Sequence, residues 1–187
     1  MNRVCLVILF ALFTCTGFSQ LQITEPDKSP LDVAYHPHGY PILKFQSSSA
    51  PALPLARVFY SRPQKNGRVI FGDIVKYNEI WRLGANESTE IEFFKEATVG
   101  KIKVPKGRYS LFCVPQAGSW TIVLNNGLYS WGTFSYDKKL DRMRTDVAVS
   151  KIETPVEYFT MAFDAAGNLM VMWDTVKVVI PIKYAAK

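Results

Sequence analysis

The stretch RYSLFCVPQAGSWTIVLNNG, residues 108–127, determines our interpretation of the fold. It contains two apolar runs, 108–114 and 120–124, and each is followed by a turn sequence, PQAG at 115–118 and NNG at 125–127. Pro, Gly and Asn suit the backbone angles of tight turns, whereas β-branched and aromatic residues favour strands. The stretch therefore predicts two neighbouring antiparallel strands joined by a short turn.

Runs of the same kind continue on both sides of this stretch. Residues 89–94, for example, alternate apolar side chains with glutamates, as a half-exposed strand requires. Helical periodicity is weak, and one short helix is expected at 137–145. We expect a mainly all-β fold, an antiparallel β-sandwich or jelly-roll-like barrel of about nine or ten strands. The predicted strands are 55–60, 68–71, 89–94, 99–104, 108–114, 120–124, 146–153, 156–164, 169–174 and 175–184.

The N-terminus has the pattern of an export signal. Arg3 precedes an uncharged apolar run at 4–13, and small residues lie before Gln20. This order is typical of a removable signal peptide, which we place at 1–19. The apolar run is shorter than the roughly 20 residues that span a bilayer, and no later stretch is long enough, so no transmembrane segment is expected. A lipid anchor at Cys15 is the alternative, although the residue before it is not the small one usual in lipoprotein signals.

The exported part divides into two segments. Residues 20–54 are rich in Pro and Ser, so we expect an extended N-terminal arm with at most an edge strand. Residues 55–187 are expected to form the β-sandwich domain. In an extended arm the rings of His36 and His38 would face the same way, which makes them weak candidates for a zinc or copper site. Incidental surface histidines explain the pair as well.

The composition argues against a nucleic-acid-binding protein and against a protein stabilised by an intramolecular disulfide. The chain has 22 Lys and Arg against 16 Asp and Glu. The basic residues are scattered, whereas a nucleic-acid interface needs them clustered, so no nucleic-acid partner is expected. Beyond the signal peptide Cys113 is the only cysteine, which excludes an intramolecular disulfide, and its apolar neighbours predict a buried, inert thiol. No motif identifies a cofactor.

The segment 79–89 is the densest in polar and aromatic side chains. It includes Trp81, Arg82, Asn86 and Glu87. An indole face can stack on the C–H groups of a sugar ring, and forked donors can hold hydroxyls or carboxylates, so this combination suits a glycan or another small ligand. The structural alternative places Trp81 in the core, pairs Arg82 with a carboxylate and uses Asn86 to form a tight turn.

A second polar segment begins at Trp131 and continues through Tyr136 and Asp137. If it is helical, Asp137 shares one face with Asp141 and Arg144. Paired carboxylates there could bind a cation or act as acid and base. An ordinary salt-bridged turn explains the same residues equally well.

Several motifs occur together in a fixed order. They are Ser-Arg-Pro at 61–63, Gly-Arg-x-Ile-Phe-Gly at 67–72, Trp-Arg-x-Gly-Ala-Asn-Glu-x-Thr at 81–89, Pro-x-Gly-x-Tyr-Ser-Leu-Phe at 105–112, and Tyr-Asp at 136–137. In this the chain resembles the bacterial domain-of-unknown-function family 2911, over roughly residues 29–184. The resemblance implies an exported envelope protein, hence a periplasmic location, and no established activity. Leu83 and Phe134 depart from the pattern, which often has Thr and Tyr there, so a hydroxyl role at either position is in doubt.

Three functions follow as hypotheses. The first is a non-catalytic binding or accessory module of the bacterial envelope. The second is a hydrolase-like enzyme using Glu87 with Asp137 or Asp141, and the third is a structural subunit that docks an envelope protein through an exposed apolar face at 169–182. For the first, the candidate ligand-binding residues are Trp81, Arg82, Asn86, Glu87, Trp131, Tyr136 and Asp137.

Overall fold

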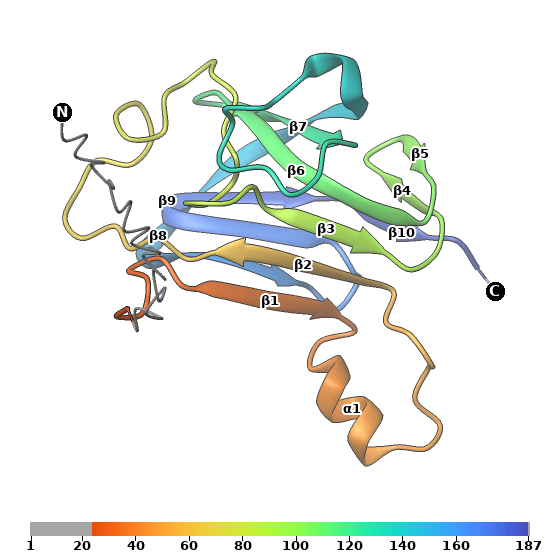
Figure 1. The fold of residues 1–187 in the computed structure, drawn as a ribbon. Helices are drawn as coiled ribbons and strands as arrows, with labels where there is room; N and C mark the ends of the chain where they lie inside the picture. The colour runs from red at the N-terminus through yellow and green to blue at the C-terminus, as the bar shows by residue number, and fades with distance from the viewer. Residues whose placement is uncertain (1–23, 187) are drawn as a thin grey trace, which may run out of the picture.

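The computed structural model describes residues 24–186, and the predicted mainly β fold is confirmed (Figure 1). The described residues form ten strands, one α-helix and one short 3₁₀ helix. In chain order these are β1 (Leu31–His36), α1 (Tyr40–Gln46), β2 (Ala56–Ser61), β3 (Glu90–Phe93), β4 (Ala97–Val99), β5 (Ile102–Val104), β6 (Gly107–Pro115), β7 (Ser119–Asn125), η1 (Lys138–Leu140), β8 (Asp141–Phe163), β9 (Leu169–Ile180) and β10 (Ile182–Tyr184).

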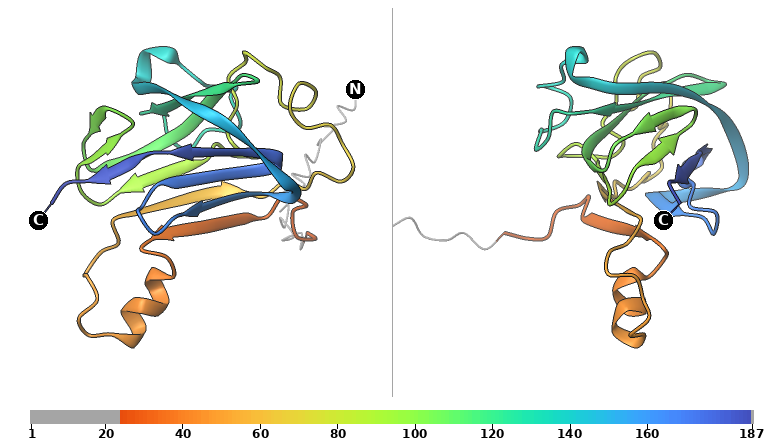
Figure 2. Two further views of the ribbon diagram at one scale, coloured as in Figure 1. Left: turned by 180° about the vertical axis from the view of Figure 1, so that it is seen from behind. Right: turned by 90° about the vertical axis from the view of Figure 1, so that its right-hand side faces the viewer.

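Seven strands form one curled antiparallel sheet in the order β1-β2-β3-β6-β7-β8-β9, and β10-β4-β5 form a small second sheet. The 23-residue strand β8 pairs first with β7 and then with β9, and Figure 2 shows it bending round from one layer to the other. Its register shifts between Lys151 and Val156, around Pro155, which cannot donate to a ladder. A bridge from Gln64 to Tyr158 brings the β2 end of the sheet against β8, giving a sandwich- or barrel-like body.

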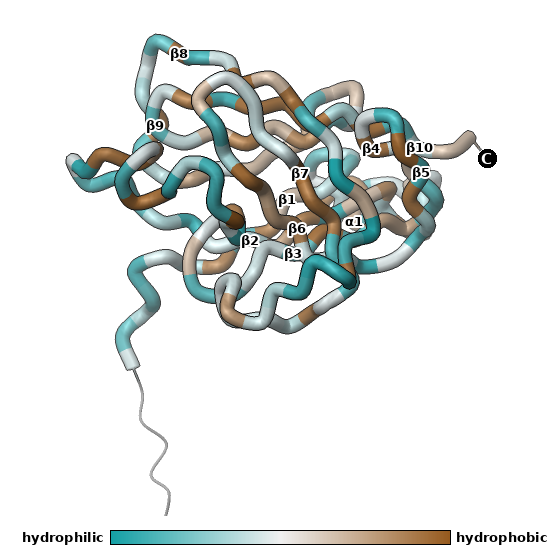
Figure 3. Tube along the Cα trace, turned by 90° about the horizontal axis from the view of Figure 1, so that it is seen from above, coloured by the Kyte–Doolittle hydropathy of each residue, from teal (hydrophilic) through white to brown (hydrophobic). Residues whose placement is uncertain are grey.

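An aromatic cluster lies at the centre of the core. Trp81, Trp120 and Trp173 pack against one another with Phe71 and Phe159, with ring centroids 5.3–6.4 Å apart. Seen from above, the hydrophobic stretches concentrate toward the middle of the molecule and the hydrophilic ones along its rim (Figure 3). The burial of these hydrophobic side chains away from water makes the main stabilising contribution to the fold.

The thiol of Cys113 is buried, as predicted, and its burial raises its pKa well above the ordinary range. Strand β9, which the structural-subunit hypothesis required to be exposed, alternates buried and half-buried residues with no exposed one among them. The strand therefore presents no open apolar face of its own.

The prediction of a helix at 137–145 is wrong. Only Lys138–Leu140 form a single 3₁₀ turn, and β8 already begins at Asp141. Residues 141–148 pair with β7 and bury Met143 and Val147 against the core. This pairing outweighs the local helical pattern because tertiary contacts decide short ambiguous segments.

The connection from β2 to β3 also differs from the expectation. Residues 68–71 form no regular strand, and the whole stretch 62–89 is a long connection held by isolated bridges such as Trp81 to Cys113. Connections of this length inside a compact domain are usually functional. Two of the motifs listed above, at 67–72 and 81–89, lie entirely within it.

The segment 20–54 contributes an edge strand, as its proline content allowed, because β1 pairs only with β2. It also contains the helix α1, which sequence reasoning did not expect and which projects from the end of the sheet (Figure 1). The predicted signal peptide and Cys15 lie outside the described residues. Among residues 24–186, no helix has the length and apolar character needed to cross a membrane.

Candidate functional site

The two polar segments singled out in the sequence meet in the structure. Glu87 and Trp131 form an antiparallel bridge. On either side of it the amide of Ser88 donates to the carbonyl of Ser130, and the amide of Gly132 donates to the carbonyl of Asn86, both at 2.9 Å. The hydroxyl of Ser88 adds a 2.6 Å bond to the Gly132 carbonyl. Asn86, Glu87 and Trp131 are thus brought together by backbone pairing of two loops far apart in sequence.

The two tryptophans of these segments have opposite environments. Trp81 is 7% exposed and packs in the aromatic core, where its indole N–H donates to the carbonyl of Gly84. Trp131 is 59% exposed. Residues paired across an antiparallel bridge project to the same side, so Trp131 lies on the side of Glu87. Of these two tryptophans, Trp131 is the one whose indole is open to solvent beside Glu87.

A cavity of about 420 Å³ opens beside this bridge. We call it the trough. It lies over β1, β2, β3 and β6, strands that lie side by side in Figure 1. Its lining comprises Leu31, Phe59, Glu87, Ser88, Glu90, Arg108, Tyr129 and Ser130. The side chain of Tyr129, 81% exposed, forms part of its rim.

A charged ladder forms the polar part of the trough floor. Arg108 lies 3.6 Å from the carboxylate of Glu90 and 3.9 Å from that of Glu92, which also pairs with Arg57 at 2.6 Å. The amide of Tyr129 donates to Glu90 at 3.1 Å. Carboxylates accept several hydrogen bonds and a guanidinium donates five, so this ladder retains capacity for ligand hydroxyls.

Sequence reasoning missed Glu90, Arg108 and Tyr129 as site residues. The alternation at 89–94 identified the exposed face of β3, but nothing in that pattern indicated which loop lies over it. Tyr129 lies two residues before Trp131, where the second polar segment begins. This closeness along the chain was the available signal.

Arg82 belongs to another cavity. It lies between the buried Trp81 and Leu83, and together with Arg68 it lines a space of about 280 Å³ on the β2–β3 connection. None of the residues lining that cavity lines the trough. Arg82 and Glu87 therefore line different cavities, although they were expected in one cleft with Trp131. The Arg82 side chain still passes close to the Trp131 segment, since a Cβ at Gly132 would lie 3.8 Å from Arg82 Cδ.

Tyr136 and Asp137 lie in a third environment, around Asp141. The Asp141 carboxylate accepts hydrogen bonds from Arg144 Nε at 2.8 Å, from Asn125 Nδ2 at 2.8 Å and from the Tyr136 hydroxyl at 2.9 Å. Burial, and then the neighbouring Asp141 carboxylate, raise the pKa of Tyr136. Asp137 is exposed and caps η1 by accepting from the Lys139 amide. This cluster is internally satisfied, and Asp141 offers no free carboxylate for acid–base chemistry.

The histidine pair is also separated. His36 is half-buried, with its ring 5.2 Å from that of Tyr184 and 5.8 Å from that of Phe163. His38 is exposed beyond the end of β1. Within residues 24–186 no three potential metal ligands gather, so we place no metal centre at these histidines.

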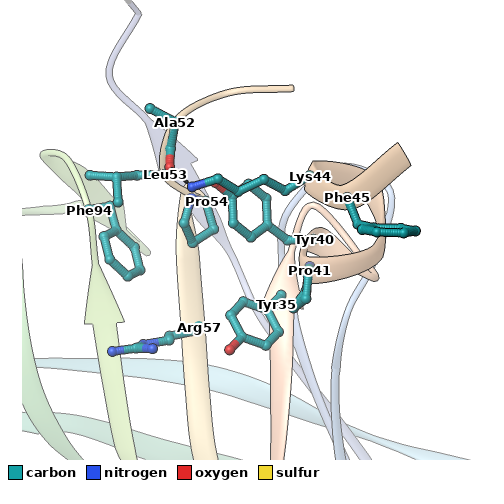
Figure 4. A pocket seen from close by; sticks show the side chains of 10 residues that line it. All are labelled: Tyr35, Tyr40, Pro41, Lys44, Phe45, Ala52, Leu53, Pro54, Arg57 and Phe94. Carbon is teal, nitrogen blue, oxygen red and sulfur yellow. Dashed lines mark hydrogen bonds between the residues drawn. The ribbon is translucent and has the colours of Figure 1, made fainter. Parts of the chain in front are cut away.

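The groove beside α1 is larger, about 510 Å³, and contains none of the predicted site residues (Figure 4). Tyr35 and Arg57 lie on its sheet side, with Phe94 and the 52–54 segment around them. Its two charged side chains are already engaged: Arg57 pairs with Glu92, and Lys44 Nζ donates to the carbonyl of Ala52. The groove offers mainly apolar contact.

The comparisons with known proteins give a family and nothing beyond it. The family described as "Protein of unknown function (DUF2911)" matches residues 48–182, which confirms the resemblance found in the motifs. No curated protein and no solved structure matches the chain. The family description assigns no activity, so function has to be argued from the site.

Proposed function

The chain belongs to the DUF2911 family of proteins of unknown function, and on that premise we propose that it is an exported, non-catalytic binding module that holds a glycan in the trough. Export rests on the signal peptide predicted at 1–19. A periplasmic, envelope location rests on the family resemblance.

The observation that supports a glycan is the pairing of exposed aromatic side chains with a charged floor. Tyr129 and Trp131 present ring faces to solvent beside a cavity that contains Glu87, Glu90 and Arg108. The C–H faces of a sugar ring pack on aromatic rings, and its hydroxyls bond to carboxylates and guanidinium groups. A purely apolar ligand would leave the charged ladder desolvated and incompletely paired, which costs free energy.

The carboxylates of the site favour binding over hydrolysis. Glycoside cleavage needs two carboxyl groups facing each other across the scissile bond, one of them held protonated. Glu90 is already bonded to Arg108 and to the Tyr129 amide, and Asp141 is held by three donors in the separate cluster. Glu87 therefore has no second, unengaged carboxylate among the residues that line the trough.

The test uses the mature protein, residues 20–187, passed over immobilised peptidoglycan and a panel of bacterial envelope polysaccharides. We expect retention on at least one of them and a loss of about tenfold in affinity for Tyr129→Ala and for Trp131→Ala, equivalent to about 1.4 kcal/mol per lost stacking contact. Phe134→Ala is the matched control, because Phe134 is 91% exposed in the same segment but is not part of the backbone bridge that places Trp131 beside Glu87.

Equal retention of all three variants, or no retention of the wild type on any polysaccharide, would contradict the proposal. Retention lost in Phe134→Ala as well would indicate that the segment as a whole, rather than the trough, makes the contact.

A further inference from the structure

The cavity that Arg82 lines is formed by residues distant in sequence. Pro63 and Arg68 come from the start of the β2–β3 connection, Val75 from its middle, and Trp173 from β9. Ala85 and Gly84 complete the wall next to Arg82. The whole space measures about 280 Å³, and no carboxylate of the part of the chain that the structure describes lines it.

Arg82 is half-buried, and the part of its guanidinium that is shielded from water lacks a partner within residues 24–186. Among the described residues its Nε, which is inaccessible to solvent, has no hydrogen-bond partner, and its guanidinium makes no ion pair. Burial lowers the pKa of Arg82, yet a guanidinium stays charged at neutral pH. Buried charges are ordinarily paired, because an unpaired one is costly to desolvate. The side chain is therefore held in an arrangement that an anion would complete.

A strained turn fixes Arg82 in this place. Leu83 has φ 55°, a left-handed conformation that is uncommon for a bulky residue, and its side chain is fully buried. Gly84 follows with φ 149°, and a Cβ there would lie 3.1 Å from the carbonyl oxygen of Ser61. Strained backbone persists where surrounding packing imposes it, and such positions gather at ligand sites. Trp81 and Leu83, both buried, thus hold Arg82 between them at the cavity.

The other walls restrict the kind of anion. Arg68 is the second cation, but it donates to the carbonyls of Lys65 and Gln64. The remaining lining includes Ser29 and the apolar side chains of Val75, Ile74 and Trp173. One free guanidinium fork matches the two oxygens of a carboxylate, whereas apolar walls would desolvate the second charge of a phosphate dianion.

We infer that this cavity binds a small monocarboxylate, with the two carboxylate oxygens on the Arg82 guanidinium and the hydrocarbon part against the apolar walls. The site is separate from the trough and does not depend on the proposed function. The carboxylate enters as a ligand and no bond is made or broken.

The binding test follows intrinsic fluorescence, because Trp81 and Trp173 line the cavity. The mature protein is titrated at constant ionic strength with acetate, butyrate and inorganic phosphate. We expect a saturable change that is tighter for butyrate than for acetate, since butyrate adds hydrocarbon against the walls, and at least tenfold weaker for phosphate. Equal responses to phosphate and butyrate would overturn the assignment.

Variants separate recognition from charge. Arg82→Met should abolish the butyrate response, and Arg82→Lys should weaken it at least fivefold, because an ammonium cannot supply the planar fork. Arg142→Met is the matched control, since Arg142 is an exposed arginine on β8 outside the cavity, and it should titrate like the wild type. A full response in Arg82→Met would overturn the inference.

A stability measurement keeps the test independent of folding defects. Without ligand, Arg82→Met should have a Tm no lower than that of the wild type, because it removes a half-buried charge whose Nε has no partner among the described residues. Butyrate should raise the Tm of the wild type and leave that of the variant unchanged. A lower Tm for the ligand-free variant would show that Arg82 stabilises the fold and would overturn the inference. Binding to polysaccharide in the trough should be the same in both proteins.

Discussion

The two polar segments, 79–89 and 131–144, have similar compositions but differ in whether their buried polar groups are hydrogen-bonded. In the second, Asp141 holds Arg144, Tyr136 and Asn125, so each buried polar group there has a partner. In the first, the Nε of Arg82 has none within residues 24–186. The difference teaches that a cluster of charged side chains indicates a ligand site only where its hydrogen bonds remain incomplete. A satisfied cluster stabilises the fold and leaves nothing for a ligand to bind.

The largest expected effect concerns the two tryptophans. Trp81→Ala should lower the free energy of unfolding by about 3–5 kcal/mol, because it opens a cavity in the aromatic core. Trp131→Ala should change it by less than about 0.5 kcal/mol, since Trp131 is on the surface. Urea denaturation of both variants measures this. Comparable losses would mean that Trp131 is a structural residue and would weaken the proposal for the trough.

A smaller effect is expected within the satisfied cluster. Asp141→Asn should cost about 2–3 kcal/mol, because it leaves Arg144 without its counter-ion and weakens the bonds to Tyr136 and Asn125. Asp137→Asn is the matched control, since Asp137 is exposed and only caps η1, and it should cost well under 1 kcal/mol. Equal stability of the two variants in urea would show that the Asp141 cluster is not what holds this segment.

The smallest effect concerns His36, which is half-buried and has no ion pair among the described residues. Burial lowers the pKa of His36 below its ordinary 6.5, and Asp164 opposes the shift. Below pH 6.5 the unfolded chain binds the proton more readily, so this contribution to stability is complete above pH 6.5 and is lost as the pH falls through the folded-state pKa. Urea denaturation should show that the free energy of unfolding falls less between pH 8 and pH 5 for His36→Phe than for the wild type. The phenylalanine keeps a ring against Tyr184 and Phe163. An identical pH dependence in wild type and variant would refute this role of His36.

Much of the architecture could be predicted from local pattern. The turns at 115–118 and 125–127 bound β6 and β7 in the structure almost as expected, because Pro, Gly and Asn determine tight turns locally. The helix at 137–145 failed because the same residues satisfy a helical period and a strand, and pairing with β7 decided between them. Pairing with neighbouring strands also explains why the predicted strands 146–153 and 156–164 are parts of one long strand, β8.

The candidate site was predictable in its parts and not in its grouping. Seven residues were expected in one cleft, but Trp81 faces the core, Arg82 lines the cavity with Arg68, and Tyr136 belongs to the Asp141 cluster. Spacing along the chain cannot distinguish these outcomes, because each depends on residues from other strands.

The sequence by itself determined that the chain is mainly β, that Cys113 is a buried thiol, and which two segments concentrate the polar and aromatic side chains. Such features depend on neighbours within a few residues, where steric preference and hydrophobic alternation act. Only the tertiary structure decided which of those side chains are satisfied. The partners of Asp141 come from β7, β8 and the loop between them. Arg82 has no such partner among the described residues, because it lies on the long β2–β3 connection where that connection folds against β9. Hydrogen-bond satisfaction is a property of atoms brought close in space, and the order of residues does not specify it.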